Sequence, residues 1–454
     1  MMDIEEIKKL VNEVVGKYKV FEGEFNSITY YWGGDYEEKT YSYDKDHNII
    51  CHVSENEIVG RLRWFLRAVY ARFCVVDENL KGYKIADNFL KFLGTSNPKE
   101  TTKSSYLFRV EGVKCEKLEE EEKKKFNVNI RSRVRLVLLK YKDESEKEYH
   151  YPLGKVTFSL KIFNTTNEKN ENRDLLVVGG TVLTLAYLGI GKATSRGFGR
   201  FYPTRWESKS LEDKLSKLIT HVKNGEVEKA FNYFYSHSGF NLENYSKWTR
   251  STIPLAPLPC NDEKNEECIK IVPLKSQKLL EVIKCTNIST LKMYYKKELH
   301  KKSIDIHTWV FGFPRAHIGA KGIETGYYYK DDRNVNNTLR RVSLVIISPV
   351  KKQTNDYDIA ILPFLSLEDF REKIIDLRHK GVGHSKKVVT ILPRKNNEAQ
   401  QSPTPKDDIK DAIEKAIKDY VNNLPKHIEN LHTKGHCKLK EVSSENSEER
   451  ERPR

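Results

Sequence analysis

The sequence has no apolar stretch approaching the roughly 20 residues that cross a bilayer. Its first 20 residues are charged, with apolar residues at helical spacing, and they lack the apolar core of a secretory signal. We therefore expect a cytoplasmic protein with no membrane partner.

Cysteine is scarce. The seven cysteines form no CxxC pair and no even set, so free thiols in a reducing compartment are expected. Cys260 and Cys268 flank an acidic loop, but no second Cys or His pair completes a zinc site. The sequence therefore predicts no metal and no other cofactor.

Positive charge is plentiful. The 454 residues include 79 Lys and Arg against 64 Asp and Glu, which leaves a net charge of +15. Such an excess favours a polyanionic partner, because each phosphate neutralised by a basic side chain releases condensed counterions.

The length predicts two packed domains, followed by a tail. Residues 1–206 show, in order, a strand at 25–32, helices at 55–73 and 85–93, strands at 106–115, 134–141 and 155–163, a helix at 174–188 and a strand at 198–206. This order is typical of a ferredoxin-like, RRM-like α+β domain with insertions.

Residues 207–395 predict a second α+β domain of the same kind. Its expected elements are helices at 211–221, 227–235 and 367–377, and strands at 268–272, 308–313, 342–348, 359–364 and 388–392. Residues 396–406 then read as a linker. Residues 407–424 place Ile409, Ile413, Ile417, Tyr420 and Leu424 on one helical face, which we expect to pack on its own domain. The charged tail after Cys437 is predicted to be disordered.

The segment 189–201, GIGKATSRGFGRF, is the most informative. Its four glycines allow backbone conformations closed to other residues and close approach to a ligand. Exposed N–H groups with Lys192, Ser195, Arg196 and Arg200 would suit phosphate oxygens. The segment is neither a Walker loop nor a dinucleotide fingerprint. The alternative is a loop that merely turns the chain.

Two further segments carry arginines that could bind phosphate bidentately. The helix expected at 59–73 bears Arg61, Arg63 and Arg67, which could instead be solvated or paired with acids. Downstream, the segment 308–322 carries Arg315, and the segment 340–352 carries Arg340 and Arg341. Tyr327, Tyr328 and Tyr329 between them could stack on bases or contribute to the core.

The GRLRWFLRA helix, followed by a glycine-rich loop ending SRGFG, resembles the CRISPR-associated RAMP superfamily. The later segments WVFGFPR and RRVSLVIISP are similar to the largest RAMP subunit of the Cmr (type III-B) effector complex. The resemblance implies two ferredoxin-like domains that hold the 3′ part of the guide RNA and the guide–target duplex and contact neighbouring RAMP subunits. It places Arg61 and Arg63 on the family's basic residues, and 189–200 on its glycine-rich loop.

Some RAMP proteins are metal-independent ribonucleases that use His, Tyr or Lys as acid and base. His47 and His52 precede the arginine helix and are the first candidates here, with His307 and His317 as a second pair. No spacing in the sequence indicates that two of these histidines meet at one site, so a non-catalytic RNA-binding subunit is the preferred interpretation. A ribonuclease and a purely structural adaptor remain the alternatives.

Overall fold

The computed structural model describes residues 16–33, 39–74, 82–97, 100–126, 151–166, 168, 170–251, 253–260, 262, 264–289, 317–318, 324–330, 336–337, 343–366, 376–380, 388–390 and 406–437. The expected strands at 134–141 and 308–313, the linker and the charged tail lie outside these residues. In the part of the chain that the structure describes, no helix is both long and apolar enough to cross a membrane.

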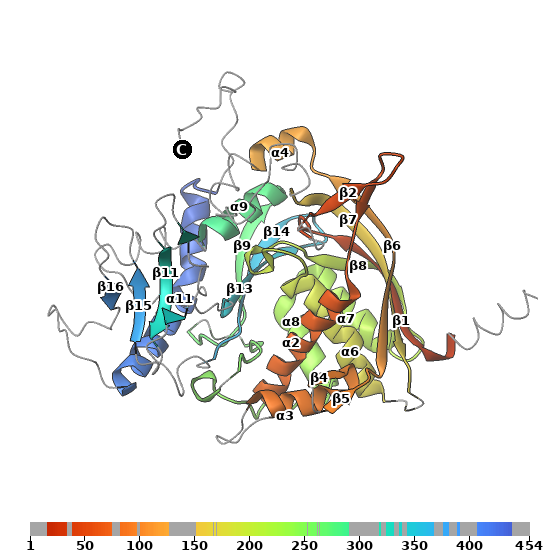
Figure 1. Ribbon diagram of the computed structural model, residues 1–454, viewed down its shortest axis with the longest axis horizontal. Helices are drawn as coiled ribbons and strands as arrows, with labels where there is room; N and C mark the ends of the chain where they lie inside the picture. Colours follow the sequence, from red (N-terminus) through yellow and green to blue (C-terminus); the bar gives the residue numbers. More distant parts are fainter. Residues whose placement is uncertain are drawn as a thin grey trace, which may run out of the picture.

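The first half is built on a four-stranded antiparallel sheet of β1 (Lys19–Ser27), β6 (Tyr106–Lys117), β7 (Leu153–Asn164) and β8 (Phe201–Glu207). Its strand order is β6-β7-β1-β8. Helices α2 (Glu55–Phe73) and α6 (Glu171–Leu183) connect the strands and cover one face of the sheet (Figure 1). The expected succession of strand, helix, two strands, helix and strand is therefore present.

Short elements fill the connections of this half. They are the hairpin β2 (Tyr41–Tyr43) and β3 (Ile49–Cys51), α3 (Gly82–Phe89), η1 (Leu90–Leu93), the hairpin β4 (Thr95–Asn97) and β5 (Glu100–Thr102), and α4 (Glu120–Phe126).

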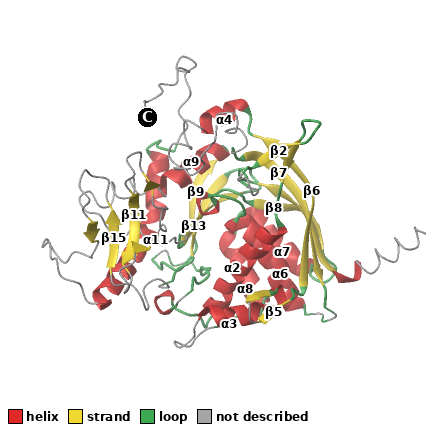
Figure 2. Cartoon of the chain, viewed as in Figure 1, coloured by secondary structure: helices red, strands yellow, loops and turns green. Residues whose placement is uncertain are grey.

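Helix α6 is the centre of the first core. Every residue from Asp174 to Leu183 is buried, because α6 lies between the sheet, α2 and the helices α7 (Glu212–Asn224) and α8 (Val227–His237). Gly180 lets α2 approach, since a Cβ there would come within 3.0 Å of Leu62. Although the sequence groups α7 and α8 with the second domain, they pack on the helical layer of the first sheet (Figure 2).

The second half contains an antiparallel sheet of β9 (Lys270–Ser276), β13 (Val345–Lys351) and β14 (Tyr357–Pro363), in the order β13-β14-β9. Helix α9 (Leu279–Ser289) and the long C-terminal helix α11 (Lys406–Thr433) pack against it. Ile417, Tyr420 and Leu424 of α11 are fully buried, so the predicted apolar stripe does pack on its own chain.

A further group of strands contains β10 (His317–Ile318), β11 (Glu324–Lys330), β12 (Asn336–Asn337), β15 (Asp376–Lys380) and β16 (Val388–Thr390). The helix predicted at 367–377 is wrong at its end, because residues 376 and 377 belong to β15 and pair with residues 330 and 329 of β11. Pairing with a distant strand overrides local propensity here.

Three disulfides correct the expectation of free thiols. They join Cys51 to Cys115, Cys260 to Cys268, and Cys285 to Cys437, while Cys74 is free and exposed. Two of the bonds span 64 and 152 residues, so tertiary contacts bring the cysteines together and their spacing could not reveal the pairs.

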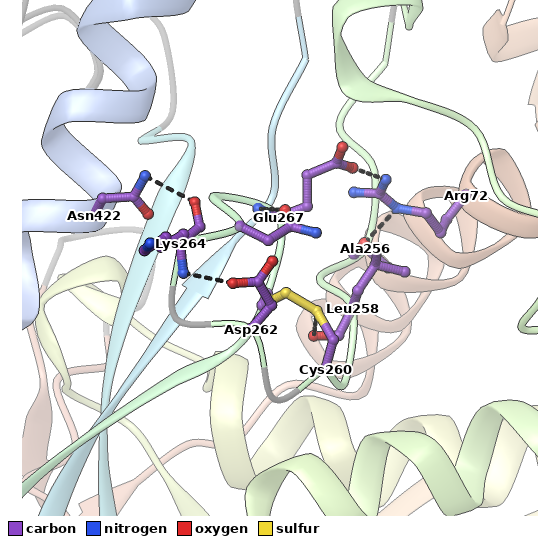
Figure 3. The surroundings of a disulfide bond; sticks show 10 residues. Arg72, Ala256, Leu258, Cys260, Asp262, Lys264, Glu267 and Asn422 are labelled. Carbon is purple, nitrogen blue, oxygen red and sulfur yellow. Dashed lines mark hydrogen bonds and ion pairs between the residues drawn. A yellow bond between two sulfur atoms is a disulfide. The ribbon is translucent and has the colours of Figure 1, made fainter.

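The loop closed by Cys260 and Cys268 connects two helices that are distant in sequence (Figure 3). The fully buried Arg72 at the end of α2 forms an ion pair with Glu267 and donates from Nε to the Ala256 carbonyl at 2.8 Å. Asn422 of α11 donates to the Lys264 carbonyl at 3.1 Å. This loop therefore ties α2 to α11, and Arg72 is occupied inside the protein.

Candidate nucleic-acid interface

The glycine-rich loop follows a π turn, η4 (Thr184–Leu188), and contains a short 3-10 turn, η5 (Thr194–Arg196). Gly189, Gly191, Gly197 and Gly199 all have φ between +69° and +92°. At Gly199 a Cβ would lie 1.8 Å from the Ile190 carbonyl oxygen. The loop therefore requires glycine on both conformational and steric grounds, as the sequence suggested.

Most of the N–H groups of this loop are used inside the protein. Gly191 donates to the Glu57 carboxylate, Lys192 to the Trp32 carbonyl, and Gly199 to the Tyr30 carbonyl. The expectation that these amides face a phosphate is wrong, because they fasten the loop to α2 and to the segment after β1. Contacts with a ligand fall to the side chains.

Arg200 is a structural residue. Its side chain is fully buried, and its guanidinium donates to the carbonyls of Thr194 (2.7 Å) and Phe198 (2.6 Å) and to the hydroxyl of Ser348 (2.8 Å). The prediction that Arg200 contacts RNA is therefore wrong, because its donors are spent within the protein.

Arg61 meets the loop from α2. Its Nη2 donates to the Thr194 hydroxyl at 3.3 Å and to the Leu188 carbonyl at 3.5 Å. The guanidinium lies over the ring of Trp64 at 5.1 Å. Trp64 is half-buried, one turn along α2 from Arg61, and the sequence reasoning missed it although the i,i+3 spacing carried the signal.

Positive charge is concentrated around this contact. Burial lowers the pKa of Arg61 to about 10, and the nearby Glu57 carboxylate partly offsets that shift. Burial also lowers the pKa of Arg200, and the charge of Arg61 lowers it further, while the hydrogen-bond acceptors of Arg200 described above are neutral. A phosphate at the mouth of the loop would relieve this repulsion.

Lys192, Ser195 and Arg196 complete the outer turn of the loop, and all three are half-buried rather than fully covered. Burial lowers the pKa of the Arg196 guanidinium. Four of the predicted residues, Arg61, Lys192, Ser195 and Arg196, therefore belong to the loop or contact it directly.

Arg63 and Arg67 lie on a different side of α2, toward α3 and η1. Arg67 forms an ion pair with Asp87 at 2.6 Å, and Arg63 donates to the Leu93 carbonyl at 3.5 Å. The paired alternative thus holds for Arg67. Arg315, Arg340, Arg341 and His307 lie outside the described residues, as does the side chain of His317.

His47 and His52, the first pair of histidines considered for catalysis, are separated. His47 sits in the turn of the β2–β3 hairpin with φ +62°, and His52 follows the other end of β3. The five residues from His47 to His52 span about 16 Å at the rise of a β-strand. Both side chains are exposed, and this separation does not favour an acid–base pair acting on one phosphate.

The open face of the first sheet is a ladder of paired charges. Lys161 pairs with Glu111 at 2.7 Å and with Glu22 at 3.6 Å, and Arg109 pairs with Glu111 at 2.6 Å. Phe21 and Phe25 of β1 and Phe158 of β7 are buried in the core on the helical side instead. At these described positions the face therefore presents paired charges and not the aromatic platform with which RRM-type sheets stack bases.

Among the described residues, no group of three His, Cys, Asp or Glu side chains is arranged to hold a metal ion.

A comparison with known protein families matches the part of the chain that contains this site. The model of the RAMP superfamily matches residues 24–202, the segment that contains α2 and the glycine-rich loop. No protein among the curated ones is significantly similar in sequence.

Solved structures share the fold over most of the chain. A chain of the type III-B Cmr-beta complex, bound to cognate target RNA and AMPPnP in the presence of ssDNA, has a TM-score of 0.53 at 12% identity and covers 91% of this chain and 100% of its own. A second Cmr-beta structure with cognate target RNA gives 0.50 at 12%, with coverages of 90% and 100%. Apo Cmr1 from Pyrococcus furiosus gives 0.45 at 17%, with coverages of 76% and 88%.

The resemblance drawn from the arginine helix and the SRGFG loop is thereby confirmed for that part of the chain: residues 24–202 match the RAMP superfamily.

Proposed function

We propose that this chain is a non-catalytic RNA-binding subunit of a cytoplasmic type III-B (Cmr) CRISPR effector complex. The observation that carries the proposal is the contact between Arg61 and Thr194, which joins the basic helix to the glycine-rich loop beside the buried charge of Arg200. Buried guanidinium groups with incomplete compensation attract phosphate, and Arg is the side chain best shaped to bind it.

The fold supports the proposal. With β1, β6, β7 and β8 numbered one to four, the sheet order β8-β1-β7-β6 is the 4-1-3-2 order of a ferredoxin-like domain. In the second half, β9, α9, β13 and β14 follow as strand, helix, strand and strand, with β14 between the other two strands. We infer a second, ferredoxin-like domain in which α11 covers the same sheet.

The proposed ligands are Arg61, Lys192, Ser195 and Arg196. Arg63, which lies on the other side of α2 with a weak carbonyl contact, remains a candidate from the sequence. Arg315, Arg340 and Arg341 remain candidates from the sequence. Such contacts reach the RNA backbone, so we expect binding without strong sequence preference.

The partners we propose are the guide RNA, in particular its 3′ part, the target RNA paired with it, and neighbouring RAMP subunits. Chains with this fold occur in Cmr-beta complexes bound to cognate target RNA. The charge-paired open face of the first sheet is separate from the proposed RNA site and so leaves room for protein neighbours.

The test is binding and cleavage of a labelled single-stranded RNA of about 40 nucleotides, a length that covers several single-strand binding footprints. The test variant is Arg61→Ala/Arg196→Ala. The matched control is Arg109→Ala/Arg205→Ala, which removes two exposed arginines from the open face of the sheet. Arg200 is left intact because its loss would disturb the fold.

We expect uncut RNA, an affinity loss of at least about 10-fold in the test variant, and little change in the control. Each lost phosphate contact should reduce the slope of log affinity against log salt by about 0.7. Cleavage abolished by His47→Ala or His52→Ala would establish the ribonuclease instead. Equal affinity of both variants would contradict the proposed site and favour the adaptor.

A further inference from the structure

We infer that the C-terminal half positions the glycine-rich loop for RNA, and that Thr286 of α9 and Ser348 of β13 are positioning residues of the binding site. This inference rests on the proposed function and names the residues that shape its site. Both residues are distant from the loop in sequence, and they reach it because β13 and α9 pack against η5.

The carbonyl oxygens of the loop are held inward. Arg200 binds those of Thr194 and Phe198, and Ser348 anchors Arg200 by accepting from its Nε at 2.8 Å. Between them, the Arg196 carbonyl accepts from the Asn287 amide at 3.4 Å and lies 3.3 Å from the Thr286 hydroxyl. That hydroxyl shares its single hydrogen between the Arg196 carbonyl and the Ile283 carbonyl, which lies at 2.8 Å. Carbonyl oxygens carry partial negative charge and would repel a phosphate, so turning three of them toward protein donors leaves the outer side of the loop to its cations.

Packing against β13 and α9 also holds the loop in one position. Gly197 lies so close to β13 that a Cβ would come within 2.7 Å of Pro349, and Ile283 of α9 lies beside it. Thr286, Asn287 and Ser348 are all fully buried. The loop is therefore held from both halves of the chain, and we infer that this fixes the segment of Ser195 and Arg196 before RNA arrives. Such preorganisation lowers the cost of binding.

Thr286→Val tests this positioning role with little change in shape. Its matched control is Thr181→Val: Thr181 is also a buried helical threonine whose hydroxyl donates to a carbonyl of its own helix, at 2.6 Å, as that of Thr286 does at 2.8 Å. The Thr286 hydroxyl differs in that it shares its hydrogen with the Arg196 carbonyl of the loop. Ser348→Ala is a second, independent variant, because it removes the hydroxyl that accepts from Arg200.

We expect Thr286→Val and Ser348→Ala each to weaken binding of the labelled RNA by about 3- to 10-fold, the effect of one hydrogen bond. Thr181→Val should bind as the wild type does. In a double-mutant cycle, Thr286→Val should add little to Arg196→Ala, because it acts through Arg196. Equal losses in the Thr286 and Thr181 variants, or full additivity with Arg196→Ala, would overturn the inference.

Hydrogen exchange without RNA separates this inference from the proposed function. Amides of residues 189–199 should exchange faster in Thr286→Val than in Thr181→Val. If the wild type binds no RNA, the proposed function fails, and exchange then decides the positioning role alone: unchanged protection of the loop in Thr286→Val contradicts it.

Discussion

At the scale of residues, the sequence indicated the glycine-rich loop but not the direction in which its side chains point. The four glycines were interpreted correctly, since all of them have positive φ. Arg196 and Arg200 look alike in the sequence, yet one lies half-buried on the outer turn and the other is enclosed by loop carbonyls and Ser348. That difference depends on β13, since Ser348 is 148 residues from Arg200, and local patterns carry no information about it.

Two glycines near the site should respond in opposite ways to alanine. Gly199→Ala places a Cβ against the Ile190 carbonyl at a φ of +69°, so we expect severe destabilisation or failure to fold. Gly60 is exposed within α2, and nothing lies within 4 Å of an added Cβ. Gly60→Ala should therefore stabilise the protein by about 1 kcal/mol.

Urea unfolding measures both effects. Similar unfolding midpoints for the two variants would show that the loop does not need glycine at position 199.

At the scale of elements, periodicity predicted the long segments well. The helix expected at 55–73 has those bounds in α2, since its apolar residues recur at helical spacing and face one core. The error at 376–377 and the undetected helix α9 arise where pairing or packing with distant segments decides the conformation. The disulfides belong to the same class, because each depends on elements that only the fold brings together.

The bond between Cys285 and Cys437 fastens the end of α11 to α9 and closes a loop of 152 residues. In the chain-entropy model this constraint stabilises the folded protein by roughly 5 kcal/mol. Cys285→Ser/Cys437→Ser should therefore have a clearly lower free energy of unfolding than the wild type under non-reducing conditions.

Cys74→Ser is the control, since Cys74 is exposed and forms no disulfide. A dithiol reductant should bring the wild type toward the double variant. A wild type that unfolds at the same denaturant concentration with and without reductant would argue against the bond.

At the scale of the whole molecule, the two halves share a hydrophobic core. Ile346, Val350 and Phe364 from the second half belong to the same buried cluster as α2 and α6. Arg200 and the loop from Cys260 to Cys268 add polar ties across the same boundary. The sequence predicted two domains from length and texture, but it could not show that they are packed so closely.

We therefore expect the described parts of both halves to unfold in one cooperative transition. Ile346→Ala should lower the free energy of unfolding by about 2–5 kcal/mol, because the side chain is fully buried in the shared cluster. The variant should still unfold in a single transition. Differential scanning calorimetry tests this, and two well-separated transitions in the wild type would contradict it.

The π turn at the end of α6 has a consequence for how this protein can change over time. Its wide turn closes through the Gly189 N–H and the Thr184 carbonyl, and it accommodates one residue more than an α-helical turn. Losing a residue there would restore a regular helix and rotate whatever follows by about 100°. The glycine-rich loop follows directly, so the number of residues in this turn sets the direction of the loop. We therefore expect insertions and deletions to be less tolerated here than in other parts of the chain.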